Sequence, residues 1–363
     1  MMNKEKIYKD LIAFHPGSYI EDIVNELNIT QQEFADRLGI SAKTISKIIN
    51  GEDNISNDIA NKLAKLTGIS INTWINLQKE YDIKSMEIKD KQNEDEEKSI
   101  CKLIDFGYLK RNHFVEDKKY SNEEKIVELR QVLNISDLSN LSEFNSVVSY
   151  RNTRGFSEKS IVNSNVMLEL AMNEARNVTD NKYTKVKLEK ILPRIRKMSL
   201  ESPRIFYPEI KRLLLDCGIV LVGLPNLKNA NLNGATKRFK NGSVMLLITD
   251  RNKRSDIFWF SLIHELGHIY LNDFYSDYKD DEKYLQKERK ADQFAANFFI
   301  PEDLYSNFIN KNEYDRESIQ HFAKELKIDP SIVVGRLQRD KYIDYSEFND
   351  LKTSYNIVRS TDV

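Results

Sequence analysis

The segment H-E-L-G-H at residues 264–268 restricts this chain more than any other part of the sequence. On a helix, side chains four residues apart lie on the same face, so His264 and His268 can bind one metal ion together. Glu265 is placed to accept a proton from a metal-bound water without ligating the ion. The flanking residues 257–271 are largely apolar, which predicts a helix buried on all sides. Burying two imidazoles and a carboxylate there is costly unless they are paired or bound to a metal.

A chance pentapeptide with two hydrogen-bonded core histidines is the alternative for this segment. The whole chain has only 5 histidines. This spacing with a glutamate inside it is therefore expected by chance in roughly one such chain in a hundred or fewer. The metal site is the preferred interpretation.

A catalytic zinc site keeps three protein ligands and an open position for water, so a third ligand is needed. The next predicted helix, about 282–299, offers Glu288 and Asp292 on one face. We predict Glu288 as the third ligand and Asp292 as the outer carboxylate that orients a ligating histidine through its second ring nitrogen. Alanines at 291, 295 and 296 would let this helix approach the first one closely. The alternative is that both carboxylates pair with neighbouring basic residues, as is common on exposed helix faces.

The pattern H-E-L-G-H followed by E-x-x-A-D-x-F-A-A-x-x-x-x-P, which ends at Pro301, resembles the ImmA/IrrE family of metallopeptidases. The runs G-I-V-L-V-G-L at 218–224, G-A at 234–235 and P-S-I-V-V-G-R-L-Q at 330–338 fit the same family. The resemblance extends over about 145–350, and its paired motifs are specific. It implies zinc-dependent cleavage of a protein partner, often a transcriptional repressor. Tyr278 and Tyr284 are within reach to stabilise an oxyanion.

Composition sets the expected cellular setting. At 363 residues the chain should form two or three domains, and its net charge of −1 gives no overall attraction to nucleic acid or membrane. Cys101 and Cys217 cannot form a disulfide framework and lack metal-ligand spacing. The chain has no run of about 18 apolar residues, and its N-terminus lacks the apolar core of a signal peptide. We therefore expect a cytoplasmic protein without a membrane segment.

The N-terminal part breaks, from Ser18 on, into five short helical units with their own start and stop signals. Thr30 and Ser41 are predicted N-caps, and Gly39-Ile40 between them forms a tight turn. A capped helix, a glycine turn and a second capped helix are the layout of a DNA-reading helix-turn-helix. The side chains expected to face phosphates and base edges belong to both helices: Gln31, Lys43, Thr44, Ser46 and Lys47.

A helical bundle that binds protein is the alternative for this domain. Residues 1–82 carry 9 Lys and Arg against 12 Asp and Glu, a net of −3, which weakens attraction to DNA. The ordered pattern from H-P-G at 15–17 to W-I-N-L-Q at 74–78 nevertheless resembles the HigA-type antitoxin branch of the XRE-family DNA-binding domains. The resemblance implies binding to double-stranded operator DNA. We expect the operator to lie in the chain's own promoter and the protein to bind it as a homodimer, which doubles the contacts.

The region between the two motifs is predicted in three parts. Residues 83–100 are rich in charge and poor in apolar groups, which indicates a charged linker that could be either helical or coiled. Residues 101–214 have apolar stripes at helical spacing and are predicted to form a helical connector. A small sheet follows, and a free edge of it could hold a substrate chain as an added strand. Its three strands are expected at 219–224, 235–240 and 243–249, with Asn241-Gly242 as a two-residue hairpin turn.

The predicted fold class is α+β and mostly helical. It comprises a five-helix helix-turn-helix domain (1–82), the linker, the connector and a zincin-like domain with a small sheet (215–350). The favoured function is a regulatory zinc endopeptidase that cuts a repressor or antitoxin, in a toxin–antitoxin or stress response. One alternative is a DNA-binding regulator whose protease fold acts as a sensor or binding platform without turnover. Another is a metal-dependent hydrolase of a non-peptide substrate. The complete set His264, Glu265, His268 and Glu288 favours the protease.

Overall fold

The computed structural model describes residues 4–143, 157–272 and 281–359, without the side chains of Asp281 and Tyr284. The chain divides into two compact units, residues 1–97 and 98–363. The observed architecture is the predicted one, mostly helical with small sheets. In the part of the chain that the structure describes, no helix is long and apolar enough to span a membrane.

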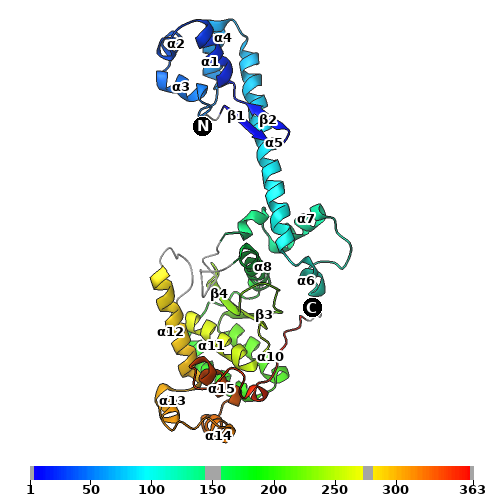
Figure 1. Cartoon of the computed structure of the whole chain (residues 1–363), viewed down its shortest axis with the longest axis vertical. Coiled ribbons are helices and arrows are strands. Elements are labelled where there is room, and N and C mark those ends of the chain that lie inside the picture. The colour runs from blue at the N-terminus through cyan, green and yellow to red at the C-terminus, as the bar shows by residue number, and fades with distance from the viewer. Residues whose placement is uncertain (1–3, 144–156, 273–280, 360–363) are drawn as a thin grey trace. The chain divides into compact units, whose positions relative to one another are not determined.

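The first unit is a helical domain preceded by a short hairpin (Figure 1). Local signals set its helix ends: the hydroxyls of Thr30, Ser41 and Ser56 each accept a backbone N–H from the first turn of a helix, and Gly39 and Gly68 end helices in the left-handed conformation. Its elements are β1 (Glu5–Tyr8), β2 (Leu11–Phe14), α1 (Gly17–Glu26), α2 (Gln31–Leu38), α3 (Ala42–Ile49), α4 (Asn57–Thr67) and α5 (Ile71–Leu103).

Two features of this unit go beyond the sequence-based expectation, which lacked the hairpin and left the conformation of the linker open. The hairpin β1–β2 was not predicted, because its turn contains Lys9 at φ 55° and Asp10 rather than a glycine or asparagine pair. The predicted linker 83–100 lies within α5, a continuous helix of 33 residues. Residues 71–103 contain neither glycine nor proline, and the Lys and Glu that indicated a linker are good helix formers. The fifth helix is therefore not short.

The second unit surrounds a three-stranded sheet with helices (Figure 1). The helices before the sheet are α6 (Phe106–Arg111), α7 (Asn122–Leu133), α8 (Glu158–Ala175), α9 (Lys185–Lys197) and α10 (Pro203–Asp216). Those after it are α11 (Ser255–Leu271), α12 (Asp281–Phe299), α13 (Glu302–Ile309), α14 (Arg316–Leu326) and α15 (Pro330–Arg339). Short 3₁₀ turns lie at Leu138–Leu141, Met198–Leu200 and Asn349–Leu351.

The sheet has the strand order β3 (Ile219–Leu224), β5 (Val244–Thr249), β4 (Gly234–Arg238). Strand β5 pairs in parallel with β3 and antiparallel with β4, and all its side chains are buried. Alternate residues of β3 and β5 belong to two separate apolar cores, one on each face. Residues 101–214 supply helices to both cores, so they pack in the same unit as the sheet rather than forming a separate connector.

The predicted hairpin joins β4 to β5, but its turn is one residue longer than expected. The backbone N–H of Phe239 donates to the Ser243 carbonyl, and that of Gly242 donates to the Phe239 carbonyl. Gly242 has φ 89°, which glycine adopts without strain. The turn therefore comprises residues 240–242, and β4 ends at Arg238 instead of at 240.

Candidate metal centre

Helix α11 presents both histidines of the H-E-L-G-H segment on one buried face. His264 and His268 are 4% and 0% exposed, and their Nε2 atoms lie 3.1 Å apart. The i, i+4 spacing alone produces this proximity once the segment is helical. Glu265 is also buried, at 3% exposure.

Helix α12 reaches this face because small residues line the contact between the two helices. Ala291 and Ala295 of α12 are buried, and a Cβ added to Gly267 of α11 would lie only 3.4 Å from the Ala291 Cα. The close approach brings Glu288 against both histidines. Its Oε2 lies 3.5 Å from His264 Nε2 and its Oε1 lies 3.3 Å from His268 Nε2.

Asp292 lies one turn beyond Glu288 on the same helix. Its Oδ1 is 2.8 Å from the Nδ1 of His264, the ring nitrogen that faces away from Glu288. An N–H on Nδ1 donated to this carboxylate would fix the ring orientation and leave Nε2 free to ligate. The Asp292 side chain is 44% exposed, so this outer pair is the more solvated part of the cluster.

The charges in this cluster depend on one another. Burial alone would lower the pKa of His264, but hydrogen bonds with Asp292 and Glu288 outweigh it and raise that pKa to about 9. Burial would raise the pKa of Glu288, whereas its hydrogen bonds with His264 and His268 hold it far below its usual value. The site therefore favours an ionised glutamate surrounded by positive charge, carried by protons or by a cation.

The arrangement of donor atoms fits a zinc ion. The ligand atoms of tetrahedral zinc lie about 3.4 Å apart, because each is about 2.1 Å from the metal. His264, His268 and Glu288 each offer one atom within 4.8 Å of the others. The shortest separations, 3.1 to 3.5 Å, match the tetrahedral value. Two imidazoles and one carboxylate are also a donor set that catalytic zinc sites use.

Strand β4 lies beside Glu265, a contact that the sequence analysis missed. A Cβ on Gly234 would lie 2.6 Å from the Glu265 Cγ, so only glycine leaves room for this carboxylate. The sequence signal was Gly234 at the start of a predicted strand, a position where glycine often marks a close approach.

The outer edge of β4 is open to a further strand. Within the described ranges, β4 pairs only with β5. Phe239 and Asn233 direct backbone groups toward β5. The antiparallel alternation therefore directs those of Gly234 and Thr236 outward, next to Glu265.

The two tyrosines considered for an oxyanion role cannot be placed. Tyr278 falls outside the described residues, as does the side chain of Tyr284.

The predicted DNA-contact residues gather on α2 and α3 of the first unit. Gln31 and Lys43 are exposed, whereas Thr44, Ser46 and Lys47 are half-buried. Thr44 shares a hydrogen bond of 2.8 Å with the Ser41 hydroxyl, and the Lys47 amine lies 3.5 Å from the Asp53 carboxylate. Lys43 is therefore the more available cation of the two.

Comparisons with known proteins match two parts of the chain to families. Residues 20–74 match a family described as helix-turn-helix, and residues 226–338 match one described as IrrE N-terminal-like domain. An uncharacterized HTH-type transcriptional regulator of Escherichia coli is 32% identical over 72 residues, which are 20% of this chain and 77% of the relative. Virulence-associated protein I of Dichelobacter nodosus is 29% identical over 85 residues, 23% of this chain and 78% of the relative.

Two solved structures are similar in sequence to about a quarter of the chain. A putative antidote protein of a plasmid maintenance system from Nostoc punctiforme is 37% identical with a TM-score of 0.23, covering 23% of this chain and 91% of its own. A HigA-family addiction module antidote protein from Coxiella burnetii is 32% identical with a TM-score of 0.21, with the same coverage. The two family matches, a helix-turn-helix and an IrrE N-terminal-like domain on one chain, support a regulatory role.

Proposed function

We propose that this chain, which joins a helix-turn-helix domain to an IrrE N-terminal-like domain, is a DNA-binding zinc metallopeptidase that cleaves a protein partner. The observation that carries the proposal is the buried cluster of His264, His268 and Glu288 with Glu265 beside it. If the cluster only stabilised the fold, the position of the Glu265 carboxylate beside the open edge of β4 would serve no purpose.

Each residue has a separate role in the proposed reaction. His264, His268 and Glu288 would hold zinc, and Asp292 would orient His264. When bound, zinc supplies Lewis-acid polarisation of a carbonyl and lowers the pKa of a water molecule. Glu265 would accept the proton of the attacking water and return it to the departing amine nitrogen.

An extended segment of the partner would lie along the outer edge of β4. The outward backbone groups of Gly234 and Thr236 would pair with it as with an added strand. Such pairing would bring a peptide bond beside Glu265, because Gly234 lies next to that residue. A compact substrate without an extended segment would leave the outward backbone groups of β4 without hydrogen-bond partners from the substrate.

The DNA-binding domain suggests the class of substrate. A protease that binds DNA is concentrated near proteins on the same DNA, at up to roughly millimolar levels when its reach spans the gap. A DNA-associated repressor or antitoxin is therefore the proposed partner. Self-cleavage between 83 and 100 is disfavoured, because those residues are helical in α5 and peptidases act on extended chain.

The test is to co-express the chain with the products of its genetic neighbours and to search for fragments by mass spectrometry. Fragments should appear with the wild type and be absent with Glu265→Gln. If zinc-supplemented and stressed cells yield no Glu265-dependent fragment, the protein is instead a regulator that uses its IrrE-like domain for binding alone.

The contact between Gly234 and Glu265 leads to a prediction about activity. Gly234→Ala should lower kcat/KM about tenfold or more, because the new Cβ displaces Glu265 by steric contact. Zinc content should not change, since the three ligands lie on α11 and α12. Gly107→Ala on α6 is the matched control, because its Cβ meets only the ends of two side chains, those of Arg111 and Asp105, far from the metal centre in sequence. Full activity in Gly234→Ala would show that Glu265 does not need its present position.

The exposure of Lys43 leads to a prediction about DNA binding. The protein should protect an inverted repeat in its own promoter, with half-sites about one helical turn apart. Lys43→Ala should weaken binding several-fold and reduce the salt dependence by about one counterion per protomer. Lys47→Ala should have a smaller effect, because Asp53 already neutralises part of its charge. Lys79→Ala on α5 is the charge-matched control, and equal loss in all three variants would contradict the assigned recognition helix.

A further inference from the structure

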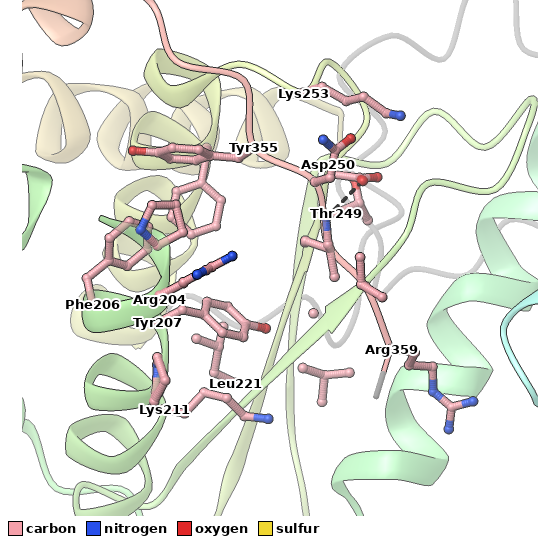
Figure 2. Close-up of a pocket in the computed structure, with 18 of the residues that line it drawn as sticks. Arg204, Phe206, Tyr207, Lys211, Leu221, Thr249, Asp250, Lys253, Tyr355 and Arg359 are labelled. Carbon is pink, nitrogen blue, oxygen red and sulfur yellow. Dashed lines mark hydrogen bonds between the residues drawn. The ribbon is translucent and has the colours of Figure 1, made fainter. Parts of the chain in front are cut away.

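A cavity of about 890 Å³ lies beside strand β3, at the edge of the sheet opposite β4. Its walls come from α10, β3, the first turn of α11 and the C-terminal segment 355–359 (Figure 2). This volume is within the range of small-molecule sites, about 300–1,000 Å³. None of the residues assigned to the candidate metal centre lines it.

One side of the cavity is apolar and aromatic. Phe206 of α10, Phe258 of α11 and Tyr355 pack against one another, with ring centroids 5.5 to 5.7 Å apart. Ile257 continues this wall. Such a surface suits the apolar body of a ligand and is rigid, because each ring is fixed by the other two.

Polar groups face the same space from the sheet. The Gly218 carbonyl accepts from Val244 of β5, so the parallel alternation directs the backbone groups of Leu221 and Gly223 away from β5, to the open edge. Tyr207 covers Gly223 so closely that any Cβ there would collide with its hydroxyl. Burial raises the pKa of Tyr207 to about 12, so this hydroxyl stays protonated and can donate.

The charges around the cavity favour an anion. Arg204, Lys211 and Lys253 line it, and none of them has a carboxylate partner among the described residues. Arg204 and Lys211 extend from α10 on either side of Tyr207 toward the strand edge (Figure 2). The acidic Asp250 is already engaged, because its two oxygens accept backbone N–H groups from Asn226 and Ile357 at 2.7 and 3.1 Å. Arg204 and Lys211 thus face one space without a described carboxylate partner, and Lys253 adds positive charge at its rim.

The C-terminal segment limits what can enter. The Tyr355 N–H donates to the Lys253 carbonyl, and the Arg359 guanidinium pairs with Glu174 at 2.8 Å. With the bond from Ile357 to Asp250, the segment is fixed at three points across the cavity. A polypeptide strand running along β3 would have to cross this segment, whereas a small molecule would fit beside it.

We propose that this cavity binds a small organic anion that has an apolar or aromatic body and one acidic group. The body would lie on Phe206, Phe258 and Tyr355, and the acidic group would face Arg204 and Lys211. This site is distinct from the metal centre and does not depend on peptidase activity.

The cavity is also connected to the helix that carries the candidate metal ligands. Ile257 and Phe258 belong to the first turns of α11. The Lys352 amine lies 2.8 Å from the Asp256 carboxylate, and the Ser255 N–H donates to the Thr353 carbonyl at 2.8 Å. A ligand held between α11 and the C-terminal segment would therefore stabilise the start of α11.

The probe for the test is anilinonaphthalene sulfonate, an aromatic anion that fluoresces in apolar sites. In the full chain with Trp74→Phe, Trp259 is the sole remaining tryptophan, and it packs 4.7 Å from Phe206 at the cavity wall. Excitation of Trp259 should therefore produce fluorescence from the bound probe by energy transfer. The combined Arg204→Ala and Lys211→Ala variant should bind it about tenfold more weakly, and Lys211→Ala alone more weakly than the wild type, whereas Lys324→Ala, the same single change on α14, should not weaken binding.

Competition tests the chemical class. Hexanoate should displace the probe, while hexanol and inorganic phosphate at the same concentration should not. Displacement by hexanol alone, by phosphate alone, or an unchanged affinity in the Arg204 and Lys211 variant would each overturn the proposal. If Trp74→Phe destabilises the first unit, the shift of the melting temperature by the probe in the wild-type chain and in the double variant decides the same question.

Discussion

Glu265→Gln will retain about one zinc per chain and lose cleavage of the partner by about 10²-fold to 10⁴-fold. The amide has the size of the carboxylate and fits the same space beside Gly234. It cannot accept a proton from the attacking water, so the loss should appear in kcat rather than in zinc affinity. Zinc measured by elemental analysis and cleavage measured on the same sample separate the two effects.

The ligand variants should give the opposite pattern. His264→Ala and Glu288→Ala remove one of three donors and should release zinc on dialysis, so that activity and metal are lost together. Asp292→Asn should weaken zinc by about tenfold to a hundredfold, because it acts only through the His264 ring. Loss of zinc from Glu265→Gln, or full retention of zinc in Glu288→Ala, would contradict the assignment of Glu288 as a ligand and Glu265 as the proton acceptor.

The cluster of candidate metal ligands was largely predictable because its geometry is local. The positions of His264 and His268 follow from helical periodicity, and an apolar surround fixes the helix as buried. Glu288 belongs to another helix, α12. It reaches the histidines because small side chains line the contact between α11 and α12, and the alanines at 291 and 295 indicated such a contact. The family resemblance pointed to the same residues, and the match over 226–338 supports the domain.

The unpredicted features depend on contacts far apart in the sequence. The close approach of Gly234 to Glu265 joins a strand to a helix about 30 residues later, and glycine alone gives no direction to such a contact. The cavity beside β3 is closed on one side by the C-terminal segment 355–359. The composition of this segment gives no sign that it lines a cavity. For α5, charge patterning was a weaker guide than the absence of glycine and proline.

Arg336 lies outside the candidate metal centre but contacts the helix that carries Glu288. It belongs to α15, and its guanidinium donates to the carbonyls of Ala296 and Ile300 at the C-terminal end of α12, at 3.3 and 2.6 Å. It also pairs with Glu302 at 2.7 Å and lies 3.7 Å from the Tyr305 ring centroid. A positive charge at the end of a helix stabilises its unpaired carbonyls. The helix in question is the one that carries Glu288.

Arg336→Met should destabilise the second unit by about 3 kcal/mol, because the buried Ile300 carbonyl loses its charged donor and Glu302 its ion pair, while a side chain of similar length remains. The Arg336 side chain is only 8% exposed, so water cannot readily replace its guanidinium. Urea unfolding followed by the fluorescence of Trp259 in the Trp74→Phe chain measures this change. Arg339→Met is the matched control on the same helix: its side chain is 41% exposed, pairs with the adjacent Asp340 and lies 5.0 Å from the Phe260 ring centroid, so we expect a loss of about 0.5 to 1 kcal/mol. Equal midpoints for the two variants would mean that Arg336 contributes no more than a surface charge and that α12 is held in place by its apolar contacts with α11.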